Sequence, residues 1–309
     1  MRERHFYFQS QDGRTECHGI RWIPEGKIRG ALQICHGMAE YAERYREIAA
    51  FLTDRGILVT AHDHLGHGGS VERQEDYGYF AREKGNQILL LDMRRVFRYT
   101  KKEYPEVPCF FLGHSMGSFL TRQYLCHFGK DLQGAVLCGT GYYPYWLVRL
   151  GMLLAQTEAA LWGDRHKSAL LMHLSFGVYN AAFRPNRTEF DWISRDPAVV
   201  DAFVTDPACG FPFTANGFYN LFGCLSRIAR PEDLARMPKE LPVLLLAGSQ
   251  DPVGGFGRGV RRVEEQLCQI GMRDVKCILY PEDRHEILNE PDRRQVYEDL
   301  WNWMQEKML

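Results

Sequence analysis

The strongest constraint in this chain is a rhythm of short apolar runs that alternate with amphipathic segments. The runs are almost continuously apolar, which is typical of parallel strands buried on both faces of a sheet. They begin near residues 30, 57, 108, 133, 241 and 275. Helical apolar spacing is found in segments 42–54, 87–103, 116–128, 256–270 and 293–307. This alternation predicts an α/β fold with a mostly parallel central sheet and helices on both faces.

Two segments depart from the rhythm. Residues 5–26 form two alternating runs around Gln11-Asp12-Gly13, which predicts an antiparallel hairpin at one sheet edge. From Gly141 to about Arg230 the chain is helical and aromatic and then rich in turns. Because the strand pattern resumes at Leu241, we expect an inserted helical cap over 141–230 and a core built from 1–140 and 231–309. A separate helical domain is the alternative interpretation.

Composition narrows the classes of partner. The 309 residues carry a formal net charge of -1, which offers no field to attract nucleic acid or anionic lipid. The nine cysteines form no CxxC pair, and Cys35, Cys109, Cys138 and Cys277 lie within apolar runs, so we expect buried reduced thiols. The N-terminal residues lack an apolar signal region, and no apolar stretch has the length of a membrane span. We therefore expect a cytoplasmic protein; its oligomeric state is left open.

The pentapeptide Gly113-His114-Ser115-Met116-Gly117 follows an apolar run and precedes a helical pattern. A nucleophilic serine on a sharp turn between strand and helix needs small residues two positions before and after it, and Gly113 and Gly117 meet that need. The helix N-terminus also supplies backbone N–H groups for a developing oxyanion. This context favours a nucleophile at Ser115 over an ordinary glycine turn.

A nucleophilic serine requires a base, and the base requires an acid that orients it. Asp251 follows the run that begins at 241, and His285 follows the run that begins at 275. The order Ser, Asp, His is that of the α/β-hydrolases. Helix capping is the alternative role for Asp251, a surface loop the alternative setting for His285, and Asp283 the alternative acid.

The oxyanion hole needs a second donor from the loop after the run that begins at 30. His36-Gly37-Met38 occupies that loop, so we expect the backbone N–H groups of Met38 and Met116 to form the hole. A plain glycine turn is the alternative.

A cluster of His62, Asp63, His64 and His67 raises the question of a metal site. Side chains 62 and 64 share a strand face while Asp63 points away, and no cysteine or further carboxylate completes a ligand set. We therefore predict no metal site here, and no cofactor elsewhere in the chain.

Together these motifs resemble the monoacylglycerol lipase and lysophospholipase branch of the α/β-hydrolases, which is grouped with S33 serine aminopeptidases. The motifs are His36-Gly37-x-x-Glu40, Asp63-x-x-Gly66-His67-Gly68-x-Ser70, Gly113-His114-Ser115-Met116-Gly117, Gly248-x-x-Asp251-Pro252-Val253 and Arg284-His285-Glu286-x-x-Asn289-Glu290. The resemblance implies an α/β-hydrolase fold with a helical cap, and a triad of Ser115, Asp251 and His285.

The resemblance also implies a substrate class, namely small or lipid carboxylic esters of the monoacylglycerol or lysophospholipid type. Many monoacylglycerol lipases carry histidine after the glutamate of the first motif, where this chain has Tyr41. The segment from Tyr142 to Trp162 is expected to line an acyl tunnel or to contact a membrane or micelle surface transiently. Packing on the core below is the alternative.

Two other functions are compatible with the sequence. An aminopeptidase of the S33 type would need carboxylates in the cap to bind a free amine, and Glu158, Asp164, Glu189 and Asp191 are candidates. A non-catalytic receptor or scaffold on the same fold is the second alternative, which an intact triad disfavours.

Overall fold

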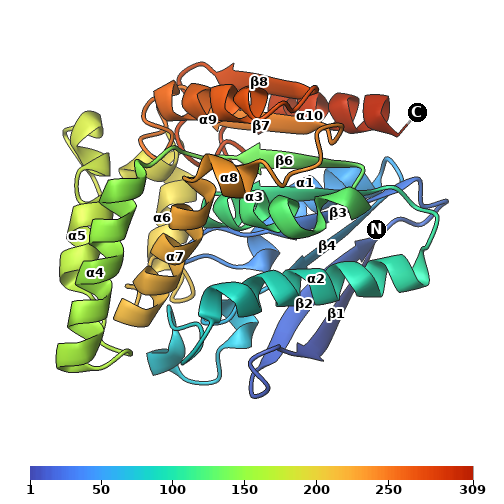
Figure 1. The fold of residues 1–309 in the computed structure, drawn as a ribbon. Coiled ribbons are helices and arrows are strands. Elements are labelled where there is room, and N and C mark those ends of the chain that lie inside the picture. Colours follow the sequence, from blue (N-terminus) through green and yellow to red (C-terminus); the bar gives the residue numbers. More distant parts are fainter. Residues whose placement is uncertain (309) are drawn as a thin grey trace.

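The computed structural model describes residues 1–308, which build one eight-stranded sheet with helices on both faces (Figure 1). The strand order is β1-β2-β4-β3-β5-β6-β7-β8. The strands are β1 (Arg2–Gln9), β2 (Glu16–Ile23), β3 (Gly30–Cys35), β4 (Ile57–His62), β5 (Cys109–His114), β6 (Gly134–Cys138), β7 (Val243–Gly248) and β8 (Val275–Tyr280). Strands β3 to β8 pair in parallel, and the hairpin β1–β2 pairs antiparallel at one edge. The predicted α/β-hydrolase architecture is confirmed.

Side chains of the central strands alternate between two separate cores. In β5, Cys109 and Phe111 belong to one core, whereas Phe110 and Leu112 belong to the other. The first core receives α2 (Gly85–Glu103), α3 (Met116–Phe128) and α9 (Arg258–Gln269), and the second receives α1 (Arg46–Thr53) and α10 (Arg293–Lys307). Burial of both faces explains why the strand sequences are continuously apolar. The five predicted helices thus correspond to observed elements.

The chain between β6 and β7 leaves the sheet and gathers at one end of the molecule (Figure 1). It contains α4 (Tyr145–Trp162), α5 (Ala169–Phe176), α6 (Pro197–Thr205), α7 (Ala215–Ile228) and α8 (Pro231–Leu234). Short 3-10 turns η5 (Tyr179–Phe183) and η6 (Asp191–Ile193) separate α5 from α6. No helix within residues 1–308 is both long and apolar enough to cross a bilayer.

The nine cysteines are all free. Cys35, Cys109 and Cys138 are buried as predicted. Cys277 is only half-buried, because its strand β8 is the last of the sheet and has no further strand beside it.

A buried carboxylate anchors the turn of the N-terminal hairpin. Asp92 in α2 accepts hydrogen bonds from the Ser10 hydroxyl (2.6 Å) and the Gln11 amide (2.8 Å). Burial raises the pKa of Asp92 from its ordinary value of 3.8 to about 6. Because the folded state holds this proton more tightly than the unfolded state, stability falls as pH rises from about 4 through about 6 and then levels off.

We expect the free energy of unfolding of the native chain, taken relative to that of Asp92→Asn, to fall by about 2–3 kcal/mol between pH 4 and pH 7. The measurement is the free energy of urea unfolding of both proteins at the two pH values. The free energy that the asparagine itself costs in the turn is the same at both pH values, so it cancels when the two differences are compared. A difference that stays constant over this range would contradict the assignment.

Candidate active site

Ser115 lies on a strained turn between β5 and α3. Its backbone has φ 50 and ψ -118, a left-handed conformation that side chains other than glycine rarely adopt. The flanking glycines make the turn possible: a Cβ on Gly117 would lie 1.9 Å from the Cys35 carbonyl oxygen, and one on Gly113 would lie 2.3 Å from the Gly117 oxygen. The serine is therefore presented at the carboxyl end of the sheet, where ligands of such folds bind.

Asp251 and His285 come from the loops after β7 and β8 and meet beside this turn. His285 Nδ1 lies 3.0 Å from Oδ1 of Asp251, and both side chains are buried. The same Asp251 oxygen accepts the Val253 amide at 2.9 Å, which fixes the carboxylate. His285 and Ser115 line one cavity. The alternative acid, Asp283, instead pairs with Arg195 (Nη2–Oδ1 3.1 Å).

In the loop after β3, the amides on either side of Met38 have hydrogen-bond acceptors and the Met38 amide has none within the described residues. The Gly37 amide donates to Oε1 of Glu40 at 2.6 Å, and the Ala39 amide donates to Nε2 of His67 at 3.2 Å. Within residues 1–308 the Met38 amide donates to no group, and Met116 is the first residue of α3, where amides have no partner inside the helix. Two donors are thus available to an oxyanion.

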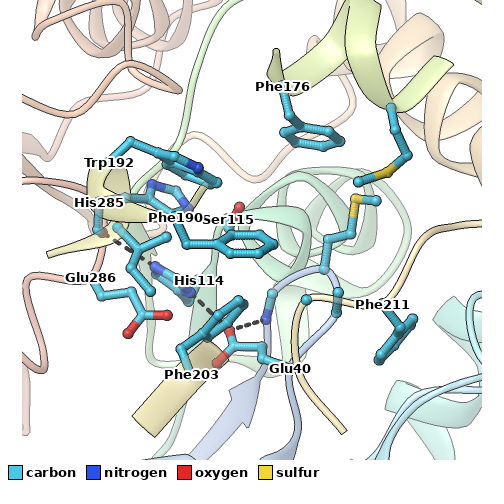
Figure 2. A pocket seen from close by; sticks show the side chains of 16 residues that line it. Glu40, His114, Ser115, Phe176, Phe190, Trp192, Phe203, Phe211, His285 and Glu286 are labelled. Carbon is cyan, nitrogen blue, oxygen red and sulfur yellow. Dashed lines mark hydrogen bonds and ion pairs between the residues drawn. The ribbon is translucent and has the colours of Figure 1, made fainter. Parts of the chain in front are cut away.

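Glu40 is the centre of a buried polar network under the site (Figure 2). Besides the Gly37 amide, it accepts hydrogen bonds from the Tyr45 hydroxyl (2.8 Å), His114 Nδ1 (2.9 Å) and Arg44 (2.8 Å). The Arg44 guanidinium also donates two 2.7 Å bonds to Glu286, the residue after His285. The network therefore connects the loop of Met38, the turn of Ser115 and the loop of His285.

Charges in this network shift two pKa values in opposite directions. Burial raises the pKa of Glu40, but the bond and charge of His114 and the charge of Arg44 outweigh it and hold that pKa far below its usual range. Burial lowers the pKa of His114, but the bond and charge of Glu40 outweigh it and raise that pKa. Both His114 nitrogens face acceptors, because Nε2 lies 3.3 Å from the His285 carbonyl oxygen. This geometry fits a protonated His114.

The histidines beyond β4 pack on one another. His62 and His64 have ring centroids 4.8 Å apart, and His36 and His64 are 4.4 Å apart. Asp63 points the other way, as predicted, and accepts His18 Nδ1 at 2.7 Å. Burial lowers the pKa of His62 to about 3, so its ring is neutral. Among the described residues, no three or more His, Cys, Asp or Glu side chains are placed so that they could hold a metal ion.

Two cavities meet at Ser115. The larger has a volume of about 430 Å³ and runs between α4, α5 and α7 with an almost entirely apolar lining. The smaller has a volume of about 70 Å³ and lies over Glu40, His114 and His285 (Figure 2). Only Met38, Ser115 and Phe176 line both. A molecule with a long apolar chain and a small group would fit, with the chain in the larger cavity, the group in the smaller one, and the bond between them at Ser115.

Aromatic rings and carboxylates shape the smaller cavity. Five aromatic side chains line it: Phe176, Phe190, Trp192, Phe203 and Phe211. Glu40, Glu286, His114, Ser115 and His285 form its polar side, and among residues 1–308 no lysine or arginine lines it. Tyr41, where the related lipases often have histidine, lies outside it and donates to Asp206 at 2.8 Å.

The cap carboxylates considered for amine binding lie elsewhere. None of Glu158, Asp164, Glu189 and Asp191 lines either cavity. Asp164 accepts the Tyr79 hydroxyl at 3.1 Å, and Asp191 accepts the Arg187 amide at 2.6 Å.

Comparison with known proteins decides the family. Residues 26–292 match the model of the family described as serine aminopeptidase, S33. The chain belongs to this family of α/β-hydrolases. It is 30% identical over 232 residues to a monoglyceride lipase of Rattus norvegicus, covering 74% of this chain and 68% of that protein. It is 28% identical over 289 residues to a monoacylglycerol lipase of Mycolicibacterium smegmatis, covering 92% and 90%.

A solved structure of similar shape extends over the whole chain. A thermostable carboxyl esterase from Bacillus coagulans in complex with glycerol has a TM-score of 0.93 and 29% identity, with 100% of both chains covered. The resemblance drawn from the sequence motifs is confirmed.

Sequence reasoning missed that Arg44 joins Glu40 to Glu286 and that Trp192 lines the cavity beside His285. The only available signal was that Glu40 and Glu286 belong to recurring motifs, which does not reveal that one arginine joins them.

Proposed function

We propose that this chain hydrolyses lipid monoesters, with Ser115 as nucleophile, His285 as general base and Asp251 as its orienting acid. The chain is a carboxylic ester hydrolase, and its relatives include proteins named monoglyceride lipases. The observation that carries the substrate proposal is the meeting of a large apolar cavity and a small one at Ser115. The acyl chain occupies the large cavity, and the alcohol group occupies the small one.

The reaction is acyl transfer to the serine followed by hydrolysis. A proton passes from Ser115 Oγ to His285 Nε2 while the oxygen attacks the ester carbonyl. The Met38 and Met116 amides donate to the resulting oxyanion. His285 then gives its proton to the leaving alcohol, and a water activated by the same imidazole releases the fatty acid. The cycle needs no metal or organic cofactor.

The small cavity favours an uncharged alcohol over a phosphodiester head group. A phosphate bound there would face Glu40 and Glu286, and the cations beside these carboxylates are already paired. Arg44 bonds both carboxylates and does not line the cavity, and His114, which does line it, bonds Glu40. An uncharged glycerol group meets no such repulsion. Monoacylglycerols are therefore proposed as substrates ahead of lysophospholipids.

The aminopeptidase alternative lacks support in the site. It requires free carboxylates for a substrate amine, yet the four cap carboxylates lie outside both cavities and the two cavity carboxylates are paired with Arg44. A non-catalytic role is disfavoured by the strained serine turn, which a binding protein has no reason to keep.

We propose that residues 141–230 act as a cap over the site and dock on lipid surfaces. Trp146, Leu150, Leu153 and Leu161 form an exposed stripe along α4, and Leu170 and Leu174 continue it on α5. Leu150 and Leu174 also line the large cavity, so the exposed apolar surface continues into the acyl site. Such a surface fits the interface of a bilayer or micelle.

Replacing Trp146 and Leu153 together by serine is expected to weaken binding to phosphatidylcholine vesicles by about 100-fold or more, since each fully buried apolar side chain contributes about 1.5–3 kcal/mol. Neither residue lines the large cavity, so hydrolysis of dissolved 4-nitrophenyl butyrate should be unchanged. Vesicle sedimentation measures the first effect. Tyr7→Ser, which removes an exposed ring on β1, is the matched control. Equal vesicle binding by all three proteins would contradict the docking proposal.

The test of the function is a panel of 4-nitrophenyl esters from acetate to palmitate, with monoacylglycerol, lysophosphatidylcholine and aminoacyl anilides. We expect a preference for long acyl chains and a rate on monoacylglycerol at least 10-fold above that on lysophosphatidylcholine. Cleavage of anilides without cleavage of esters would establish the aminopeptidase. Absence of turnover together with absence of labelling by a fluorophosphonate would establish a non-catalytic role.

A further inference from the structure

The imidazole of His285 has an aromatic neighbour on each side. The Trp192 ring lies 5.2 Å away with an interplanar angle of 40°, and the His114 ring lies 4.8 Å away at 42°. Figure 2 shows the His285 ring between these two side chains. Trp192 comes from η6, in the segment between β6 and β7, whereas His114 comes from β5 in the sheet.

Trp192 is held in this place by its own segment. Its amide donates to Oδ1 of Asn180 at 3.0 Å, and its ring packs against Tyr179 (5.1 Å) and Phe176 (6.4 Å). The next residue, Ile193, accepts the Glu286 amide through its carbonyl at 2.7 Å. The tryptophan is therefore tied to the loop that carries His285.

The same loop and the tryptophan segment share a buried carboxylate. Glu290 accepts the Ser194 hydroxyl (2.8 Å), the Arg195 amide (3.1 Å) and the Arg284 amide (2.9 Å). The tryptophan and the histidine thus belong to one hydrogen-bonded unit, although the two residues lie far apart in the sequence.

We propose that Trp192 is a positioning residue for His285, which holds the imidazole in place and stabilises it while it carries a proton during acyl transfer. This inference rests on the proposed role of His285 as the base. It concerns a residue outside the triad and outside the oxyanion hole.

The charges around His285 explain why an aromatic face is useful there. Asp251 lies at Nδ1 of His285, so the proton gained during acyl transfer lies beside a carboxylate. On the β5 side, His114 faces acceptors with both nitrogens, a geometry that fits a protonated ring, and a charge on that ring would repel the transferred proton. An indole ring attracts a cation that lies within about 6 Å of its centroid. The Trp192 ring therefore attracts the proton that His285 gains, whereas a positive charge on His114 repels it.

The test compares Trp192→Leu and Trp192→Phe with the native chain on 4-nitrophenyl acetate, whose short acyl group makes little use of the large cavity. We expect Trp192→Leu to lower kcat about 3- to 30-fold with KM within twofold. The acid limb of the kcat/KM profile should move to lower pH, because the imidazolium loses its aromatic neighbour. Trp192→Phe should give an intermediate loss and an intermediate shift.

Trp162→Leu is the matched control, since it removes an exposed indole on α4 and should change neither quantity. A Trp192→Leu variant with altered KM but native kcat and pH profile would show that Trp192 only lines the cavity and contacts substrate. That result would overturn the proposal. If that variant does not fold, a Trp192→Phe profile identical to the native one overturns it. Failure of the proposed function is distinct: the native chain would then be inactive, or Ser115→Ala would retain its rate.

Discussion

Replacing Ser115 by alanine is expected to lower kcat for ester hydrolysis by about 10⁵- to 10⁶-fold, because no acyl-enzyme can form. KM should change little, since the hydroxyl contributes little to the two cavities that hold the substrate. The residual rate should still exceed that of water, because the Met38 and Met116 amides and the cavities remain. The measurement is kcat and KM on 4-nitrophenyl butyrate.

The structure supplies a strict control for this prediction. Ser226 is a half-buried serine in α7 that lines neither cavity and donates to the Gly223 carbonyl at 2.9 Å. Ser226→Ala should keep the native rate and remain labelled by a fluorophosphonate, whereas Ser115→Ala should lose both. Native activity in the Ser115→Ala variant would remove Ser115 from the mechanism and leave the strained turn without a function.

Local sequence patterns predicted the elements that local physics determines. The strands that begin at Gly30, Ile57 and Val243 are almost continuously apolar because both sheet faces are covered, and this burial is visible in the sequence itself. The turn at Ser115 was also predictable from local sequence. Its two glycines are required by close contacts within β5, α3 and the adjoining β3, so the glycine spacing of the motif indicates the shape of the turn.

Contacts between distant segments were not predictable. Arg44 bonds Glu286, which lies 242 residues later, and nothing in either local sequence identifies the other as its partner. The placement of Trp192 over His285 depends on how the segment between β6 and β7 returns to the sheet, which the helical periodicity of that segment does not determine. The roles of Ser115, Asp251 and His285 and the cap boundary at 141–230 stay predictions.

Replacing Glu40 by alanine is expected to lower the free energy of unfolding by about 3–5 kcal/mol, because it leaves the buried His114 without its carboxylate partner and Arg44 with Glu286 alone. It also frees the Gly37 amide that fixes the loop of Met38. We therefore expect kcat to fall about 100-fold or more as the oxyanion donor is misplaced. Thermal unfolding followed by circular dichroism and kcat on 4-nitrophenyl butyrate measure the two effects.

The stability lost in Glu40→Ala should depend on pH in a defined way. The pKa of Glu40 is lowered in the folded state, so its contribution is complete above about pH 4.5 and declines in more acidic solution. The pKa of His114 is raised, so its contribution is complete below about pH 6.5 and declines as pH rises further. The difference in the free energy of unfolding from the native chain should therefore be largest between about pH 4.5 and 6.5.

The control is Glu43→Ala, which removes an exposed carboxylate from the same segment. It should show neither the loss of stability nor this pH dependence. A loss of equal size from pH 4 to pH 9 would mean that Glu40 acts by packing alone, and the charged link between the three loops would have to be abandoned.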